Sequence, residues 1–370
     1  MEILKKIPFI DLKQTYEEEK KELLNCIDKV LKLGHLVMTP ELAEFENNVC
    51  QYTDAKHCIG LNSGTDALMM ALMCAGVKKN DEVITTPISF VATTGAIAHI
   101  GAKPIYVDTG NDLNIDPKLI EKAITKRTKA IVPVHWSGKI AEMDEIMKIG
   151  KKYNLPVIED SAQTMGAFYK NKHGGTFGLA GAISCHPLKN LNALGDGGLL
   201  LTNDDEVAAK VKRYRNHGLE GRDNCVEYGV NSRLDVLNAE VLNFRLTKLN
   251  EVIFKRQKNV GLYREMIKTD KVKIPYENTY QSNAYVMCLC LCEQRNELKA
   301  FLEMKGIETL IYYGTPLHMH QAAQKFGYKK GDFPNAESQC EKVLALPHHQ
   351  YMSKSEISYV SQKINEFYCH

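Results

Sequence analysis

The chain has 370 residues, of which 44% are hydrophobic, so it is long enough to bury a sizeable core in one large domain or two. Lysine and arginine number 47 and aspartate and glutamate 45, and a formal charge of +2 gives no overall field that would attract nucleic acid or an anionic membrane. We therefore expect neither as the main partner, and a charged fraction of 25% argues against a disordered chain.

Short apolar runs alternate with helical patterns through the N-terminal part of the chain. The runs are rich in valine, isoleucine and leucine, which is typical of strands buried on both faces, and they lie at 58–61, 82–89, 103–108, 129–135, 155–160, 181–185 and 198–202. Helices are predicted between them at 67–75, 117–124 and 143–152. This order predicts an α/β fold with a mainly parallel central sheet.

The pattern changes near residue 229. A helical stretch, one helix or a pair, covers 236–266 and leads to a strand at 284–292, a helix at 295–305 and a final helix at 353–368, for which Ser353 is a candidate N-cap. We expect a large α/β domain at 1–245, beginning with a short N-terminal extension of roughly 20 residues, and a smaller α+β domain at 246–370.

The eleven cysteines are too few for a disulfide scaffold in a chain of this length, and their number is odd. The N-terminal segment has no signal-peptide pattern, and no run is long enough to span a bilayer, so we expect reduced thiols and a cytoplasmic location. Cys288, Cys290 and Cys292 alternate along the predicted strand about 6.5 Å apart. Thiolates that share a zinc ion lie within about 4 Å of each other, so we favour core packing for them and expect no metal.

The first chemical motif is the small polar segment at 62–66 that follows a predicted strand and precedes a helix. Backbone N–H groups at such a helix start together with the helix dipole form an anion site. Ser63, Thr65 and Asp66 are equally good helix caps, so this motif alone is weak.

The second motif places Asp160 at the carboxyl end of a predicted strand, the edge where ligands of open α/β sheets bind. A carboxylate there can meet a cationic ligand such as a pyridinium nitrogen and keep that ring an electron sink. A surface carboxylate fits this segment equally well.

The third motif places Lys189 just beyond another buried strand, with Pro187 before it and a glycine-rich segment after it. A partly desolvated lysine has a lowered pKa and becomes a nucleophile for Schiff-base chemistry. The glycines precede a strand instead of following one, so they do not form a dinucleotide-binding fingerprint.

Phosphate cradle, strand-end aspartate and lysine follow one another in the order of the fold-type-I enzymes that use pyridoxal 5′-phosphate (PLP). At these residues, and almost from end to end, the chain resembles the nucleotide-sugar aminotransferases of the DegT/DnrJ type. The segments that carry the resemblance are IPFIDLK (7–13), LNSGTDAL (61–68), SFVATTGAIAHIGAKPIYVD (89–108), VPVHWSGKIAEMDEI (132–146), IEDSAQTMGA (158–167), SCHPLKNLNALGDGGLLLTND (184–204) and YGVNSRLDVLNAEVL (228–242).

The resemblance implies a role for each residue that matches a family motif. Lys189 is expected to form the internal aldimine and to move a proton during the reaction, and Asp160 to pair with the ring nitrogen. Gln163 is expected to hydrogen-bond the phenolic oxygen of the ring, and Phe90, where some members have tryptophan or tyrosine, to lie against the ring face.

The remaining roles concern the phosphate and the substrate. Gly64, Thr65 and Ser184 are expected to hold the phosphate, and Asn231 to reach the phosphate of a neighbouring subunit's cofactor, which makes a homodimer with shared active sites. The weaker candidates for the substrate side are Arg233, Tyr313 and His318.

The resemblance implies a transaminase that takes an amino group from glutamate, with pyridoxamine 5′-phosphate between the half-reactions, and gives it to a nucleotide-linked keto-deoxysugar. The product would be an amino sugar for a surface polysaccharide or glycoconjugate. The segment ALGDGG (193–198) resembles that of enzymes acting on 3-keto sugars more than that of enzymes acting on 4-keto sugars. Lys189 stands where the dehydratase branch of the family has histidine, which disfavours that branch.

Other interpretations remain. A 4-keto sugar aminotransferase is the nearest one, and a PLP-dependent lyase or desulfurase would use Cys225 as its loop cysteine. A PLP-binding regulator would need a DNA-binding segment, and the chain has no basic helix-turn-helix pattern. A metalloenzyme would be built from His318, His320, His348 and His349, whose spacing favours ordinary loop histidines.

Overall fold

The computed structural model describes residues 6–369. Its central sheet consists of a three-stranded group in the order β3-β2-β4 and a four-stranded group in the order β1-β9-β8-β5. Parallel bridges from Ile131 to Val157 and from Val134 to Asp160 join the two groups between β4 and β5. The strands are β1 (His57–Leu61), β2 (Glu82–Thr85), β3 (Lys103–Tyr106), β4 (Thr128–Ile131), β5 (Ile158–Asp160), β8 (Ala180–Ser184) and β9 (Gly198–Thr202).

The sheet is mainly parallel, as predicted. β2 pairs in parallel with β3 and β4, and β5 pairs in parallel with β8, whereas β9 is antiparallel to both β8 and β1. The strand β2 ends at Thr85, four residues before the end of the predicted run, because Pro87 follows and has no amide for the ladder. Since β4, β5 and β8 run in the same direction, their carboxyl ends meet at one edge of the sheet.

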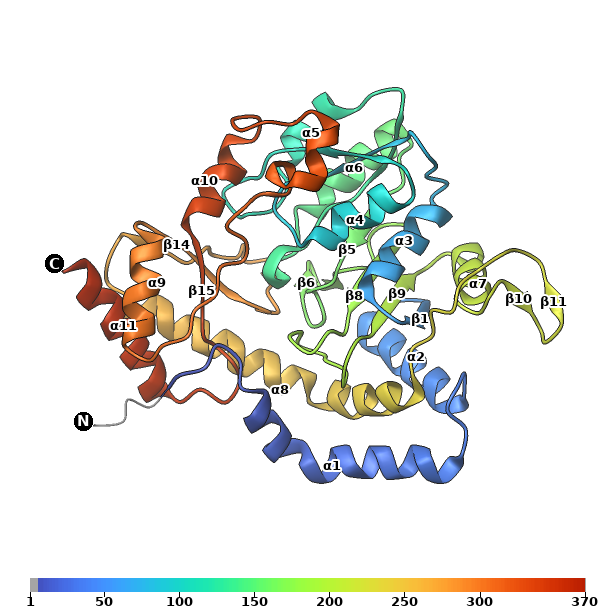
Figure 1. The fold of residues 1–370 in the computed structure, drawn as a ribbon, viewed down its shortest axis with the longest axis horizontal. Coiled ribbons are helices and arrows are strands. Elements are labelled where there is room, and N and C mark those ends of the chain that lie inside the picture. The colour runs from blue at the N-terminus through green and yellow to red at the C-terminus, as the bar shows by residue number, and fades with distance from the viewer. Residues whose placement is uncertain (1–5, 370) are drawn as a thin grey trace.

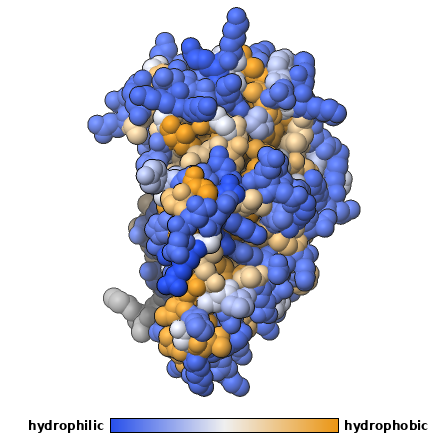
Figure 2. Space-filling model, turned by 90° about the vertical axis from the view of Figure 1, so that its right-hand side faces the viewer, coloured by the Kyte–Doolittle hydropathy of each residue, from blue (hydrophilic) through white to orange (hydrophobic). Residues whose placement is uncertain are grey.

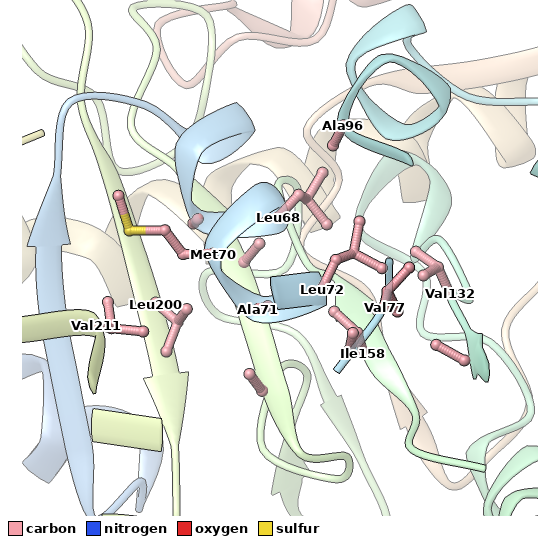
Figure 3. Packing of buried hydrophobic residues seen from close by; sticks show 14 of the residues in the cluster. Leu68, Met70, Ala71, Leu72, Val77, Ala96, Val132, Ile158, Leu200 and Val211 are labelled. Atoms are coloured by element: carbon pink, nitrogen blue, oxygen red, sulfur yellow. The ribbon is translucent and has the colours of Figure 1, made fainter. Parts of the chain in front are cut away.

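Helices cover both faces of the central sheet (Figure 1). Side chains alternate along β9, so that Leu200 packs with the helices of one face while Leu199 and Leu201 pack with those of the other. On the first face α3 lies against β8 and β9, and Figure 3 shows Leu68 and Leu72 of this helix pointing into the core. The helices of this part are α2 (Pro40–Thr53), α3 (Gly64–Cys74), α4 (Val91–His99), α5 (Pro117–Ala123), α6 (Met143–Tyr153) and α7 (Asp205–Tyr214).

A single helix, α8 (Val236–Met266), covers the stretch predicted as one helix or a pair, and the expected domain boundary at 245/246 falls inside it. The helix α1 (Leu12–Leu33) packs along α8. The C-terminal part contains the antiparallel sheet β12-β14-β15, with helices beside it (Figure 1). Its elements are β12 (Val272–Lys273), β14 (Cys288–Cys292), α9 (Arg295–Met304), α10 (Pro334–Lys342), β15 (Val343–Leu346) and α11 (Lys354–Tyr368).

The strand β14 begins at Cys288, four residues later than predicted. The reason is that residues 284–287 use their backbone elsewhere: the N–H of Ala284 donates to the carbonyl of Gly138, and that of Val286 donates to the carbonyl of Ser137. The predicted cap of the last helix is confirmed, since Ser353 and Glu356 form a reciprocal capping box.

The start of the described chain is joined to the C-terminal part. The N–H of Ile7 donates to the carbonyl of Gly306 at 2.8 Å, and the carbonyl of Ile7 accepts from the N–H of Glu308 at 3.0 Å. Short strands complete the fold: β6 (Phe168–Tyr169), β7 (Lys172–His173) and β13 (Gln281–Ser282) form a small sheet, and β10 (Leu219–Glu220) and β11 (Asn224–Cys225) form a hairpin.

Cys288, Cys290 and Cys292 are buried in the core of the C-terminal part, as expected from core packing. The Sγ atoms of Cys290 and Cys292 are 3.4 Å apart, closer than the strand repeat predicts, because the repeat fixes the backbone spacing and not the direction of the side chains. Within residues 6–369 no group of three or more histidine, cysteine or acidic side chains is arranged to hold a metal ion. None of the helices described in that range is both long and apolar enough to cross a bilayer.

Candidate active site

A cavity of about 380 Å³ lies at the carboxyl edge of the central sheet, where β5 and β8 end. It brings together most of the residues predicted from the motifs, although they come from separate parts of the chain. Those that line it are Gly64, Thr65, Phe90, Asp160, Gln163, Ser184, Lys189 and Tyr313. A larger groove of about 700 Å³ beside Arg264 and Tyr276 includes none of the predicted residues, so we place the site in the smaller cavity.

The start of α3 forms an anion cradle on one side of the cavity. Ser63 caps the helix, with its Oγ accepting from the N–H of Asp66 at 3.1 Å, and the amides of Gly64 and Thr65 have no partner among the described residues. A Cβ at Gly64 would lie 3.0 Å from the Cβ of Ser184, so glycine permits the helix start to approach the end of β8 closely. Two free amides, the helix dipole and the Ser184 hydroxyl suit a phosphate.

Asp160 ends β5 as a carboxylate that is only 5% exposed. Its Oδ2 accepts from the Thr93 hydroxyl at 2.5 Å, and its Oδ1 accepts from the N–H of Ala162 at 3.2 Å. Burial raises the pKa of Asp160 above its usual value, while Thr93, Ala162 and the positive charge of Lys189 oppose the rise. The carboxylate is therefore held in place and has room to pair with a cationic ligand group.

Gln163 has its amide orientation fixed by the backbone. The N–H of Ser137 donates to Oε1 of Gln163 at 2.5 Å, which identifies this atom as the oxygen. The Nε2 group therefore remains as a donor for an acceptor in the cavity.

Lys189 follows β8 in a turn closed by its own N–H, which donates to the carbonyl of His186 at 2.8 Å. Burial lowers the pKa of Lys189 to about 8, and the attraction of Asp160 opposes this change. A larger share of this amine is unprotonated near neutral pH than in an ordinary lysine, which makes it a nucleophile.

Aromatic side chains form one wall of the cavity. Phe90 is the N-cap residue of α4 and is half exposed, with its ring centroid 6.0 Å from that of Tyr313. Tyr313 in turn lies 5.5 Å from Trp136. Such a wall provides a flat apolar surface for a ring-shaped ligand.

Three predicted residues lie outside this cavity. Asn231 is exposed and borders a separate groove of about 580 Å³, and Arg233 donates to Oδ1 of Asn216 at 3.0 Å. His318 is buried, with Nε2 bound to Glu337 at 3.0 Å and its ring 4.7 Å from Phe333. His318 thus packs in the C-terminal part, and its expected contact with substrate stays a prediction.

The sequence motifs do not point to four further residues at this site: Ser89, Thr93, His135 and Trp136. Three of them line the cavity, namely Ser89, His135 and Trp136. The fourth, Thr93, donates a hydrogen bond to the carboxylate of Asp160. The signal for Ser89 and Thr93 was present in the segment 89–108, in which two hydroxyl residues stand one helical turn apart at the start of a helix.

The DegT/DnrJ/EryC1/StrS aminotransferase family matches residues 17–365 of the chain. A pleiotropic regulatory protein of Geobacillus stearothermophilus is 39% identical, over 98% of this chain and 99% of that protein. The UDP-2-acetamido-2-deoxy-3-oxo-D-glucuronate aminotransferase of Pseudomonas aeruginosa is 37% identical, over 96% of this chain and 98% of that protein.

Solved structures show the same fold. The crystal structure of DesV from S. venezuelae superposes with a TM-score of 0.95 at 34% identity and covers 98% of both chains. The structure of NtdA from Bacillus subtilis, which contains the bound cofactor pyridoxamine 5′-phosphate, superposes with a TM-score of 0.91 at 29% identity and covers 99% of this chain and 86% of that one.

Proposed function

The chain belongs to the DegT/DnrJ/EryC1/StrS aminotransferase family and is a PLP-dependent transaminase of nucleotide sugars, and we propose that it moves an amino group from glutamate to the 3-keto carbon of a nucleotide-linked deoxysugar. The product would be an amino sugar for a surface polysaccharide or glycoconjugate. All eleven cysteines are unpaired, which fits the reducing environment of the cytoplasm, where we place the reaction.

The observation that carries the proposal is that one cavity contains an anion cradle, a buried carboxylate and an amine with a lowered pKa. These groups match the phosphate, the ring nitrogen and the aldehyde of PLP. When bound, the cofactor supplies an aldehyde that takes up amino groups and a ring that accepts the electron pair left by a departing proton.

We assign the phosphate to the amides of Gly64 and Thr65 and the hydroxyl of Ser184. This hydroxyl accepts from the N–H of His186 at 3.3 Å and keeps its own hydrogen for an anion. The orientation of these groups is set by the helix start and the strand end, which are rigid parts of the fold.

The ring would lie between the aromatic wall and the polar edge of the sheet. Asp160 would keep the ring nitrogen protonated, Nε2 of Gln163 would donate to the phenolic oxygen, and Phe90 would pack on the ring face. Lys189 would bind the aldehyde and, once displaced by a substrate amine, act as the base that moves the proton. Tyr313 and the nearby Trp136 line the same cavity and are our candidates for contact with the sugar.

Four relatives support the 3-keto position. They are named as transaminases or aminotransferases of a 3-oxo glucuronate, of two dTDP-3-amino sugars and of a UDP-N-acetyl-3-dehydro-glucosamine, at 33–37% identity. The 4-keto position is the alternative outcome of the substrate test below.

We also propose a homodimer with shared sites. The hairpin β10–β11 extends from the body of the molecule (Figure 1), and Tyr228 just after it is 96% exposed. Val226 and Val230 are exposed as well, and Figure 2 shows apolar patches among the hydrophilic side chains of this side of the molecule. Asn231 follows this segment and does not line the cavity of its own chain, and we therefore assign it to the cavity of a partner.

A spectroscopic and substrate test separates the alternatives. We expect a visible absorption band from the bound cofactor that is lost on addition of glutamate and restored by a 3-keto nucleotide sugar, with the amine product detected by mass spectrometry. Restoration by 4-keto sugars alone would select the alternative. Release of pyruvate or sulfide from amino acids would select a lyase or a desulfurase.

The structure gives the desulfurase interpretation no support. Cys225 lies in the exposed hairpin, where its thiol donates to the carbonyl of Glu227 at 3.2 Å, and it does not line the cavity.

A further inference from the structure

We propose that Thr93 is a positioning residue of the reaction, which holds the carboxylate of Asp160 against the ring nitrogen, and that Ser89 fixes the direction of its hydroxyl. The inference rests on the proposed function, because it concerns the group that keeps the cofactor ring protonated. It assigns a task to two buried hydroxyl groups that the mechanism above does not use.

The three side chains form one buried line. Thr93 is 1% exposed, and its Oγ1 lies 2.5 Å from Oδ2 of Asp160 and 2.6 Å from Oγ of Ser89. Ser89 is 4% exposed. The hydroxyl of Thr93 therefore sits between the other two groups and is shielded from water.

The direction of the hydrogen bonds follows from the chemistry of the groups. An ionised carboxylate has no hydrogen to give, so the single hydroxyl hydrogen of Thr93 goes to Asp160. The bond between Ser89 and Thr93 must then be donated by Ser89. Ser89 thus donates to Thr93, and Thr93 donates to Asp160. Hydrogen bonds that are linked in this way strengthen one another.

Asp160 depends on this chain because few other groups support its charge. Its Oδ1 has one backbone donor, the N–H of Ala162. The titratable groups that act on it are Lys189 and His135, which favour the ionised form, and Tyr313, whose own pKa is raised in part by Asp160. Without the Thr93 hydroxyl the carboxylate would lose the donor on Oδ2 and the restraint on its rotation.

The helix α4 explains why Thr93 is well placed for this task. Phe90 is the N-cap of α4, and the N–H of Thr93 donates to the carbonyl of Phe90 at 3.2 Å. The first turn of one helix thus presents both the aromatic ring of the cavity wall and the hydroxyl that holds Asp160. The helix start also provides a positive dipole end near the carboxylate.

The test compares variants of neighbouring threonines. Thr93→Val keeps the shape and removes the hydroxyl, Thr93→Ser keeps the hydroxyl, and Thr94→Val is the matched control because the Thr94 hydroxyl contacts Tyr106 at 3.1 Å. We expect Thr93→Val to lower kcat about tenfold or more in both half-reactions with little change in KM, since a hydrogen bond to a charged group is lost. Thr93→Ser and Thr94→Val should remain near the wild-type rate.

The apoprotein gives a second measurement that does not depend on activity. Burial raises the folded-state pKa of Asp160, so its charge weakens the fold as the pH rises through that pKa, and the cost persists above it. Removal of the Thr93 hydroxyl raises this pKa further. The Tm loss of the Thr93→Val apoprotein, measured against wild type, should therefore be larger at pH 8 than at pH 4, which is close to the ordinary aspartate value of 3.8. Thr94→Val should show no such difference.

If Thr93→Val does not fold, Ser89→Ala provides the same test, with a smaller fall in kcat because only the second donor of the chain is lost. Equal effects of Thr93→Val and Thr94→Val, no rescue by Thr93→Ser, or a Tm loss independent of pH would each overturn the proposal. A wild-type protein without a glutamate-sensitive band would instead overturn the proposed function, so the two failures are distinguishable.

Discussion

Burial acts on two groups of the cavity in ways that suit their tasks. It lowers the pKa of the Lys189 amine to about 8 and raises the pKa of the Asp160 carboxyl. In both cases burial stabilises the neutral form relative to the charged form. The attraction between the two charges works against both changes. The amine is thus a nucleophile near neutral pH, while the hydrogen bonds of Asp160 favour its ionised form.

The lowered pKa of Lys189 predicts how the apoprotein takes up PLP. Only the unprotonated amine reacts with the aldehyde, so the rate of uptake should rise with pH, with a midpoint near pH 8, and become constant above it. Stopped-flow measurement of the visible band over a pH series would show this profile. A midpoint near 10.5, the value of an ordinary lysine, would contradict the burial of this amine.

Asp160→Asn offers the control for that profile. The variant loses the negative charge that favours protonated Lys189, so the midpoint should move to lower pH while the final amplitude of the band changes little. The same variant should transaminate far more slowly, because a neutral amide does not keep the ring nitrogen protonated.

The residues of the site differ in how far the sequence could predict them. Lys189, Asp160 and Gly64 stand in local motifs, next to the strand or helix that positions them, and a short segment is enough to identify each. Thr93 is bound to Asp160 across 67 positions of the chain, and only the fold reveals that pairing. Trp136 likewise meets Tyr313 through the packing of distant segments.

At the scale of elements, the cradle depends on the contact between β9 and the start of α3. Gly198 begins β9, between Leu61 of β1 and Ser184 of β8, and a Cβ there would overlap the backbone of Ser63 and Gly64. The helix start can deliver its free amides to the cavity only because this position carries no side chain.

Gly198→Ala should therefore displace the helix start and weaken PLP binding. We expect an affinity loss of about tenfold or more, since one misplaced hydrogen bond to a charged ligand has that effect. Fluorescence titration of the apoprotein with PLP would measure it. The matched control is Gly261→Ala in α8, where nothing lies within 4 Å of the added Cβ and the helix should gain up to about 1 kcal/mol. Equal PLP affinity in the two variants would contradict this account of the cradle.

Elements with a strong local pattern were predicted well. The bounds of β9 and of α8 agree with the predicted ranges 198–202 and 236–266. The predicted start of β14 was wrong because residues 284–287 form hydrogen bonds with the backbone of Ser137 and Gly138. The composition of a segment does not show which distant carbonyl groups will accept hydrogen bonds from its amides.

At the scale of the whole molecule, the chain order does not separate the two expected domains cleanly. Ile7 falls within the range expected for the large domain. In the structure it pairs with the backbone of 306–308 and packs in the core of the C-terminal part. The helix α8 runs through the expected boundary. The division at 245/246 stays a prediction, and any relative motion of the two parts would have to bend α8 or break the pairing of Ile7.

The proposed homodimer gives the sharpest prediction at this scale. If Asn231 serves the cavity of its partner, a Lys189→Ala chain and an Asn231→Asp chain are each inactive alone, because one lacks the amine and the other brings a negative charge to the phosphate. In a mixed dimer one of the two cavities combines the intact Lys189 of one chain with the intact Asn231 of the other.

Co-expression should then restore about a quarter of the wild-type activity, since half of the dimers are mixed and each has one complete site. Tagged chains purified as mixed dimers would show this directly by activity and by one equivalent of bound PLP. A mixed dimer without activity would show that Asn231 serves the site of its own chain, and an Asn231→Asp chain that is active alone would show that Asn231 has no part in binding the cofactor.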